Sequence, residues 1–213
     1  MDFAVIFDLD GTLVETAKEG IHLLVGDTLR ALKVEPIEQD MDIFWFEADR
    51  DRVIEEKFCL DPKVFWPVFM AHYDSEFIRM YKRPYPDVEP VLAYLKKAGF
   101  RTGIVTGAAE STTTHTLRKI YHRFDNIVIA NPYHGVLPKP NPDGLHKCLA
   151  SLKASSAFYI GNGAEDILAG YSAGFKTVLI DRGEYPYAGI LPHASIATLH
   201  DLPMVLESLK NPR

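Results

Sequence analysis

Two aspartates lie one residue apart in the stretch VIFDLDGTLVET, residues 5–16. Asp8 and Asp10 follow the apolar run 5–7, which is typical of a strand that is buried on both faces. In open α/β sheets, ligands bind in the crevice beyond the carboxyl ends of the strands. Neighbouring carboxylates repel each other and are costly to desolvate, so we expect a cationic group between them. The alternative is an ordinary Asp-Gly turn after the strand.

Polar side chains also follow later apolar segments of the chain. GIVTGA contains Thr106 and Gly107, LPKPNP holds Lys139 between prolines, and YIGNGAEDILAG presents Asn162 and Asp166. If these segments belong to one parallel sheet, their ends share one edge of it. The side chains expected together at that edge are Asp8, Asp10, Thr106, Lys139, Asn162 and Asp166.

This combination of residue types predicts phosphoryl transfer. Carboxylate and carbonyl oxygens suit Mg²⁺, which often takes a further ligand from a substrate phosphate. A lysine, a threonine hydroxyl and backbone N–H groups disperse the charge of a phosphoryl group. One carboxylate can attack phosphorus, and a second can protonate the leaving oxygen and then deprotonate water.

The elements that must position these residues alternate along the chain. Apolar runs predict strands at 3–8 and in RTGIVTG, NIVIAN, AFYIGN and KTVLID, which begin at residues 101, 126, 157 and 176. Helical spacing predicts helices that begin near residues 87, 111, 142 and 165. The alternation predicts βαβ units, a parallel sheet and right-handed crossovers, that is, a Rossmann-like α/β fold.

Residues 14–83 interrupt this alternation with helical segments and no convincing strand. We therefore expect a helical domain of residues 15–83, inserted into a core domain of residues 1–14 and 84–213. The alternative is a set of ordinary helices that pack on the sheet. Pro84 and Pro86 disfavour helix in the returning linker.

Composition limits the class of protein. The 213 residues carry a net charge of −6, which argues against nonspecific binding to nucleic acid or to an anionic membrane. No apolar run approaches membrane-spanning length, and Cys59 and Cys148 lack metal-ligand spacing. We expect a cytoplasmic protein with reduced thiols that acts on a small phosphorylated metabolite. The composition leaves open whether it is a monomer or a homodimer.

The ordered motifs resemble those of the haloacid dehalogenase superfamily. DLDGT resembles its first motif, VTG its second, the lysine of PKPNP its third and GNGAED its fourth. The predicted helical insertion between the first and second motifs resembles the C1 helical cap of that superfamily. The resemblance thus covers nearly the whole chain and implies the same fold.

The resemblance implies a role for each residue that matches a motif. Asp8 would be the nucleophile and a metal ligand, and Asp10 the general acid and base, with its carbonyl also on Mg²⁺. Thr106 and the Gly107 amide would hold the phosphoryl group, while Lys139 would neutralise it and orient Asp8. The metal ligands implied are Asp8, Asp10, Asn162 and Asp166.

Asp10 separates activities within the superfamily. The dehalogenating members lack this second aspartate, because a leaving halide needs no proton, so Asp10 favours phosphoryl transfer. The helical cap and the segment RPYPDVEPVLAYLKKAG resemble the phosphoglycolate phosphatase-like branch, which hydrolyses small phosphate monoesters. The same branch includes sugar phosphomutases, so that activity remains an alternative.

Asn162 departs from the fourth motif, which usually reads Gly-Asp. An asparagine carbonyl can still ligate Mg²⁺, but the site loses one negative charge. The chain could therefore be an active enzyme with weaker metal affinity, in which Asp166 carries more of the metal binding. The asparagine could also be an introduced change that slows turnover. A third possibility is a protein that binds phosphorylated ligands without hydrolysing them efficiently.

Overall fold

The first apolar run of the chain forms the middle of a parallel sheet. The computed structural model describes residues 2–47, 49–73, 80–118, 123–184 and 186–210. In this described part, the sheet has six strands in the order β5-β4-β1-β6-β7-β8, and all neighbouring strands are parallel. The strands are β1 (Phe3–Phe7), β4 (Thr102–Thr106), β5 (Asn126–Ile129), β6 (Ser156–Gly161), β7 (Lys176–Ile180) and β8 (Ala194–Ile196).

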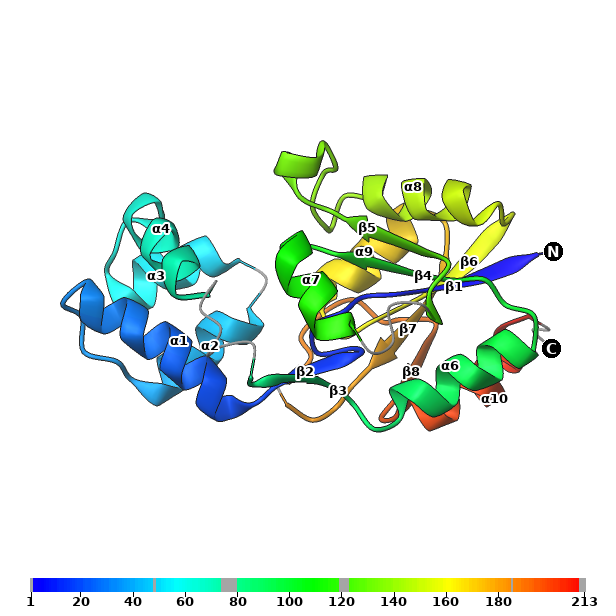
Figure 1. Cartoon of the computed structure of the whole chain (residues 1–213), viewed down its shortest axis with the longest axis horizontal. Helices are drawn as coiled ribbons and strands as arrows, with labels where there is room; N and C mark the ends of the chain where they lie inside the picture. Colours follow the sequence, from blue (N-terminus) through cyan, green and yellow to red (C-terminus); the bar gives the residue numbers. More distant parts are fainter. Residues whose placement is uncertain (1, 48, 74–79, 119–122, 185, 211–213) are drawn as a thin grey trace. The chain divides into compact units, whose positions relative to one another are not determined.

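Helices cover both faces of this sheet. They are α6 (Val88–Lys97), α7 (Glu110–Leu117), α8 (Asp143–Leu152), α9 (Ala164–Ser172) and α10 (Leu202–Lys210), with short 3₁₀ turns η2 (Pro132–His134) and η3 (Leu199–Asp201). Figure 1 shows α6 and α10 side by side on one face and α8 on the other. The predicted α/β class, with a parallel sheet, is confirmed.

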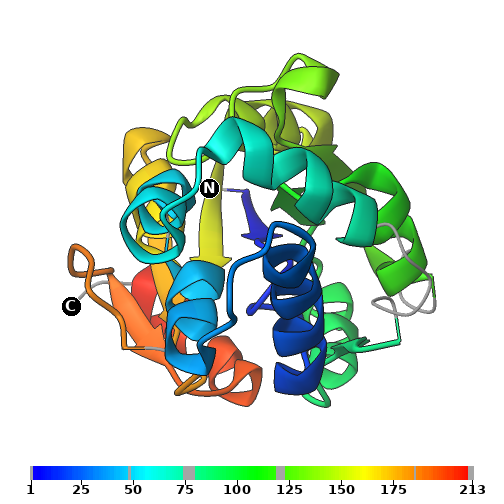
Figure 2. The same cartoon turned by 90° about the vertical axis from the view of Figure 1, so that its left-hand side faces the viewer.

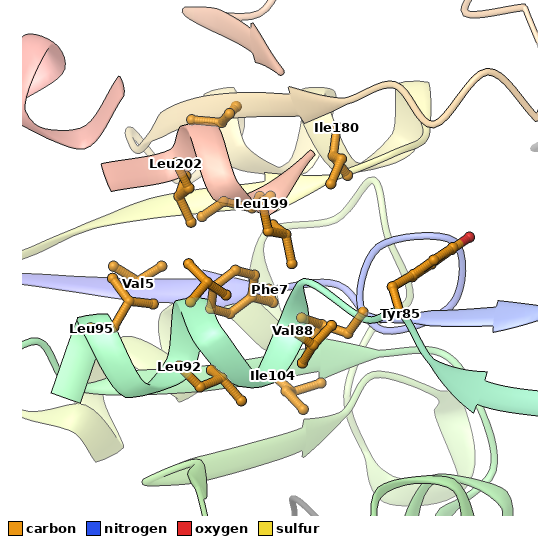
Figure 3. Close-up of a cluster of buried hydrophobic side chains, with 14 of the residues drawn as sticks. Val5, Phe7, Tyr85, Val88, Leu92, Leu95, Ile104, Ile180, Leu199 and Leu202 are labelled. Carbon is orange, nitrogen blue, oxygen red and sulfur yellow. The ribbon is translucent and has the colours of Figure 1, made fainter. Parts of the chain in front are cut away.

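The alternation of side chains along β1 divides the core into two clusters. Val5 and Phe7 pack with residues of α6 and α10, and Figure 3 shows this cluster with Leu92, Leu95 and Leu202 around Phe7. Ala4 and Ile6 point to the opposite face and pack with residues of α8 and α9. Because both faces of β1 are buried, the strand is an uninterrupted apolar run rather than an alternating one.

The inserted segment has its own helices and its own core. Its helices are α1 (Lys18–Ala31), α2 (Glu38–Phe46), α3 (Arg50–Phe58) and α4 (Pro62–Tyr73), and they can be followed from blue to teal in Figure 2. Phe44 of α2 is fully buried, and its ring lies 5.1–5.8 Å from the rings of Phe58, Phe65, Trp66 and Phe69. The chain divides into one compact unit of Met1–Glu15 and Pro84–Arg213 and a second of Thr16–Arg83.

Three short strands were not predicted. β2 (Val14–Thr16) and β3 (Lys82–Pro84) pair in a two-stranded sheet at the ends of the insertion, which corrects the expectation of no strand in residues 14–83. β8 extends the main sheet beyond β7. Each of these strands has three residues, too few to show a periodic pattern in the sequence.

Two helices border on segments that the structure does not describe. The helix predicted to begin near residue 111 is observed as α7, and residues 119–122 are not described; α4 is observed up to Tyr73, and residues 74–79 are not described. Among the helices in the described ranges, none is both long and apolar enough to cross a membrane.

Candidate active site

Asp8 is the first residue after β1 and lies at the carboxyl edge of the sheet. Its backbone N–H donates to the carbonyl of Ile160 on β6 over 2.8 Å, so the backbone pairing continues past the end of the strand. The residue is only 5% exposed. A carboxylate in this place lies where parallel sheets bind their ligands.

A tight turn follows Asp8 and fixes the path of the chain through the first motif. The carbonyl of Leu9 accepts hydrogen bonds from the N–H groups of Leu13 and Val14 at 2.8 and 2.9 Å. Gly11 has φ +78°, and a Cβ added to it would lie 2.2 Å from Nδ2 of Asn162. Glycine is therefore required here both by the backbone conformation and by the close approach of the fourth motif.

Lys139 joins the first motif to the fourth. Its Nζ donates to Oδ1 of Asp8 at 2.5 Å and to Oδ1 of Asp166 at 2.6 Å. The lysine is thus a cation between two carboxylates, but these are Asp8 and Asp166 rather than the sequence neighbours Asp8 and Asp10. All three side chains are nearly removed from solvent, which strengthens their electrostatic interaction.

Both carboxylate oxygens of Asp166 accept hydrogen bonds. Oδ1 accepts from Lys139 and, at 2.9 Å, from the hydroxyl of Tyr159. Oδ2 accepts the backbone N–H groups of Asn162 and Gly163 at 3.1 and 3.0 Å. These contacts fix the start of α9 and orient the carboxylate towards Lys139.

Gly161 makes room for that carboxylate. A Cβ added to Gly161 would lie 2.3 Å from Cβ of Asp166. The glycine of the fourth motif is therefore explained by the packing of Asp166 against the end of β6.

The buried charges influence one another strongly. The pKa of Asp8 is raised to about 7, chiefly by burial; Lys139 acts in the opposite direction, and Asp166 and Asp10 add to the rise. Burial by itself would lower the pKa of Lys139, but Asp166 and Asp8 raise it well above the usual lysine value. The site therefore holds more negative than positive charge, and an added cation would stabilise ionised Asp8.

Thr106 and Gly107 lie at the end of the neighbouring strand. Phe7 of β1 pairs with Ile104 of β4, so Thr106 and Asp8 end adjacent strands. Oγ1 of Thr106 accepts the N–H of Ala108 at 3.0 Å, a contact that does not engage the hydroxyl proton. Gly107 is exposed, and its backbone is accessible to a ligand.

The metal ligands that the resemblance implies offer oxygen donors, some of them charged and some neutral. Asp8 supplies a carboxylate, Asp10 a backbone carbonyl, and Asn162 an amide oxygen that accepts the Thr12 hydroxyl at 3.3 Å. Across the residues that the structure describes, no three His, Cys, Asp or Glu side chains form a group that could hold a metal. Hard oxygen donors beside an excess of buried negative charge nevertheless fit Mg²⁺, which retains several waters.

Two side chains at this edge were not identified from the sequence. Tyr159 is fully buried on β6 and donates to Asp166, and Arg182 follows β7 and contacts the turn after Asp8. In a sequence, a tyrosine within an apolar strand or an arginine just after one gives little indication that the residue belongs to a functional site. Only the position of Arg182 after KTVLID, at the predicted ligand-binding edge, could have indicated it.

Comparison with known proteins places the chain in a family. The sequence profile of the haloacid dehalogenase-like hydrolases matches residues 5–180. A phosphoglycolate phosphatase from Aquifex aeolicus is 29% identical over 212 residues, which cover 96% of each chain. A glyceraldehyde 3-phosphate phosphatase from Methanopyrus kandleri is 31% identical over 202 residues, 85% of each chain.

A solved structure supports the same fold. A haloacid dehalogenase-like family hydrolase from Streptococcus pneumoniae superposes with a TM-score of 0.77 at 21% identity, covering 96% of this chain and 98% of that one. The predicted resemblance, and with it the prediction of a hydrolase, is therefore confirmed. On its sequence and its fold, the chain belongs to the haloacid dehalogenase-like hydrolase family.

Proposed function

We propose that this protein is a Mg²⁺-dependent phosphatase that hydrolyses a small phosphate monoester through an aspartyl-phosphate intermediate. The observation that carries the proposal is the buried Asp8, held by Lys139 at the carboxyl edge of the sheet. Relatives that span nearly the whole chain are phosphatases of small molecules, which supports the substrate class.

In the first step, a carboxylate oxygen of Asp8 attacks phosphorus. The bond between phosphorus and the leaving alcohol oxygen breaks, and Asp10 gives its proton to that oxygen. Thr106 and the N–H of Gly107 would hold the phosphoryl oxygens. Lys139 would keep Asp8 oriented and offset the charge that gathers on the transferring group.

In the second step, Asp10 takes a proton from a water molecule that attacks phosphorus. The bond between phosphorus and Asp8 breaks, which releases inorganic phosphate, restores the Asp8 carboxylate and leaves Asp10 protonated for the next cycle. Asp166 would act mainly by holding Lys139, because both of its oxygens already accept hydrogen bonds from protein groups.

We propose that Asp8, the carbonyl of Asp10 and Asn162 would hold Mg²⁺, with Asp166 beside them. When bound, Mg²⁺ would supply positive charge that neutralises phosphate oxygens and keeps Asp8 ionised. The excess of negative charge around buried Asp8 supports this assignment. As part of the same proposal, residues 15–83 would be the cap domain that the family resemblance implies.

Asn162 supports a second candidate function. With an amide where the family usually has a carboxylate, the site could bind phosphorylated ligands and hydrolyse them poorly. Under this candidate, phosphorylated metabolites would raise the thermal unfolding temperature without being consumed. Multiple turnover of any of them would rule the second candidate out.

The primary test is release of phosphate from p-nitrophenyl phosphate and from a panel of small phosphate monoesters. We expect hydrolysis that requires Mg²⁺ and stops when the metal is chelated. Continued turnover in excess chelator would contradict the metal requirement. If no monoester were hydrolysed, the phosphatase proposal itself would fail.

A further inference from the structure

Arg182 lies at the carboxyl edge of the sheet and makes several contacts there, although the proposed chemistry gives it no role. Its side chain is only 10% exposed. Nη2 donates to the carbonyl of Thr12 at 2.7 Å, and Nη1 and Nη2 donate to the two oxygens of Asp87 at 3.1 and 3.2 Å. The guanidinium carbon also lies 3.6 Å from the centre of the Tyr85 ring.

Asp87, the partner of Arg182, is itself held from several directions. The residue immediately precedes α6 and is 5% exposed. Its Oδ2 also accepts the hydroxyl of Thr198 and the N–H of Leu199, both at 2.9 Å. Arg182 therefore reaches the turn from an anchor that is fixed to α6 and to η3.

Tyr85 contacts both the guanidinium of Arg182 and the turn after Asp8. Its N–H donates to the carbonyl of Leu13 at 3.0 Å, and its hydroxyl donates to Glu184. Figure 3 shows Tyr85 at one end of the core cluster, with its hydroxyl pointing away from the other labelled side chains. The guanidinium thus packs on an aromatic face while two neighbouring carbonyls of the turn, those of Thr12 and Leu13, are both bound.

The bound turn is the one that carries both candidate catalytic carboxylates. Thr12 accepts from Arg182 through its carbonyl and donates through its hydroxyl to Asn162. A shift of Thr12 would therefore move the backbone that follows Asp10, and it would also move the hydroxyl that contacts Asn162 of the fourth motif. In this arrangement, one planar guanidinium donates from two nitrogens to both oxygens of Asp87 and to a carbonyl while it lies over an aromatic ring, a geometry that a compact ammonium group cannot reproduce.

We propose that Arg182 is a positioning residue: it fixes the turn of residues 8–13 through Thr12 and thereby places Asp8 and Asp10 for reaction. Its kinetic consequence rests on the proposed phosphatase function. A displacement of about 1 Å of reacting groups can cost on the order of a hundredfold in rate. The groups proposed to bind phosphate, Thr106, Gly107 and Lys139, do not contact Arg182 in any interaction described above.

The test compares Arg182→Lys with wild type in two measurements. With p-nitrophenyl phosphate, we expect kcat to fall by about tenfold or more and KM to change by less than about twofold. Hydrogen–deuterium exchange should rise at the amides of residues 11–14, without a rise in β6 or α8. The exchange measurement does not depend on activity. If wild type were inactive, the phosphatase proposal would be contradicted, but exchange would still test whether Arg182 fixes the turn.

Arg123→Lys is the matched control. Arg123 pairs with Glu89 of α6 at 3.0 Å, and its carbonyl accepts the hydroxyl of Thr102, at the amino end of β4. We expect wild-type kinetics and wild-type exchange at residues 11–14 in this variant.

Asp87→Asn gives a second route to the same perturbation, since it removes the charge that anchors Arg182. It should reproduce both effects of Arg182→Lys. Unchanged kcat and unchanged exchange at residues 11–14 in a folded Arg182→Lys would overturn the proposal. So would a uniform rise in exchange across the sheet, or unfolding of both variants at the assay temperature, because Arg182 would then have only a structural role.

Discussion

At the scale of single residues, the site depends on three buried charges that satisfy one another. Lys139 donates to Asp8 and Asp166, and Asp166 accepts further hydrogen bonds from Tyr159 and two backbone amides. Buried ions are costly unless they are paired and hydrogen-bonded. Asp166 therefore accepts more of the hydrogen bonds at this site than Asp8 does, which fits the proposal that Asp8 is the nucleophile.

Asn162→Asp should strengthen binding of Mg²⁺. The side chain lies against Gly11, and its Oδ1 accepts the Thr12 hydroxyl, a contact that an aspartate could keep. The added charge should lower the Mg²⁺ concentration for half-maximal activity by about tenfold, equivalent to ~1.4 kcal/mol. Without metal, the variant should be slightly less stable, because the new carboxylate lies near other carboxylates.

Added Mg²⁺ should reverse that loss of stability in Asn162→Asp, because the metal binds the folded state. A titration of Mg²⁺ followed by thermal unfolding measures this without reference to turnover. If neither the activity nor the unfolding temperature becomes more sensitive to Mg²⁺, Asn162 is not a metal ligand.

Tyr159→Phe should reduce stability by about 1.5–3 kcal/mol, the range for a buried hydrogen bond to a charged group. The variant removes only the hydroxyl that donates to Asp166, at a residue that is fully buried. Urea unfolding measures the change in the free energy of unfolding. Tyr133→Phe is the control, since Tyr133 is 98% exposed, and it should be neutral. Equal stability of the two variants would contradict a structural role for the Tyr159 hydroxyl.

The sequence predicted which residue types gather at the site but not all of their partners. Asp8 and Asp166 come together because each closely follows an apolar strand, and the edge of a parallel sheet collects such positions; Lys139 reaches them from the loop between η2 and α8. The link between Arg182 and Thr12 joins residues 170 positions apart. No local pattern encodes that pairing, because it depends on the path of the turn in three dimensions.

At the scale of elements, α6 is fixed at its start by a charged anchor. Burial by itself would raise the pKa of Asp87, but hydrogen bonds from Arg182, Leu199 and Thr198 outweigh it, so that the pKa is lowered. The anchor ties the segment before α6 to Arg182, the second residue after β7, and to η3.

The pH dependence of stability should reveal this anchor. Because the folded pKa of Asp87 lies below its unfolded value, its stabilisation is present above the unfolded pKa of about 3.9 and is lost as pH falls towards the folded pKa. At neutral pH, Asp87→Asn should cost about 3 kcal/mol, since it leaves buried Arg182 without a charged partner. In urea unfolding, the difference from wild type should shrink below about pH 4.

Glu89→Gln is the control for Asp87→Asn. Glu89 is 62% exposed in its pair with Arg123, so its loss should cost less than about 1 kcal/mol. A cost of Asp87→Asn that stays constant from neutral pH into strong acid would contradict the assigned charge of Asp87.

Elements with long, periodic or uniformly apolar patterns were predicted well from the sequence. β1, β4, β5, β6 and β7 all form where apolar runs predicted them. β2, β3 and β8 were missed, because strands of three residues are specified by their pairing partners rather than by their own composition.

At the scale of the whole molecule, each of the two compact units has a hydrophobic core of its own. Phe44 is fully buried in the core of Thr16–Arg83, and the two tryptophans of the chain, Trp45 and Trp66, also belong to that unit. Tryptophan fluorescence should therefore report on this unit, whereas circular dichroism reports on both.

Phe44→Ala should destabilise the smaller unit by about 3–5 kcal/mol, the usual cost of removing a large buried aromatic ring. We expect the fluorescence transition in urea to move to lower concentration and to separate from the final transition seen by circular dichroism. Leu95→Ala, in the core of the larger unit, is the matched control. In this variant the fluorescence transition should not occur at a lower urea concentration than the transition seen by circular dichroism. Coincident transitions in Phe44→Ala would show that the two units unfold together.

The claim on which the whole account depends is that Asp8 becomes phosphorylated during turnover. The most direct measurement is rapid acid quenching of the enzyme with Mg²⁺ and a hydrolysed monoester, followed by mass spectrometry of its peptides. The account predicts a phosphoryl group on Asp8 that forms before steady state, decays when substrate is exhausted and is absent in Asp8→Asn. Turnover with no phosphorylated peptide, or a phosphoryl group on Asp10 or any other residue, would contradict it.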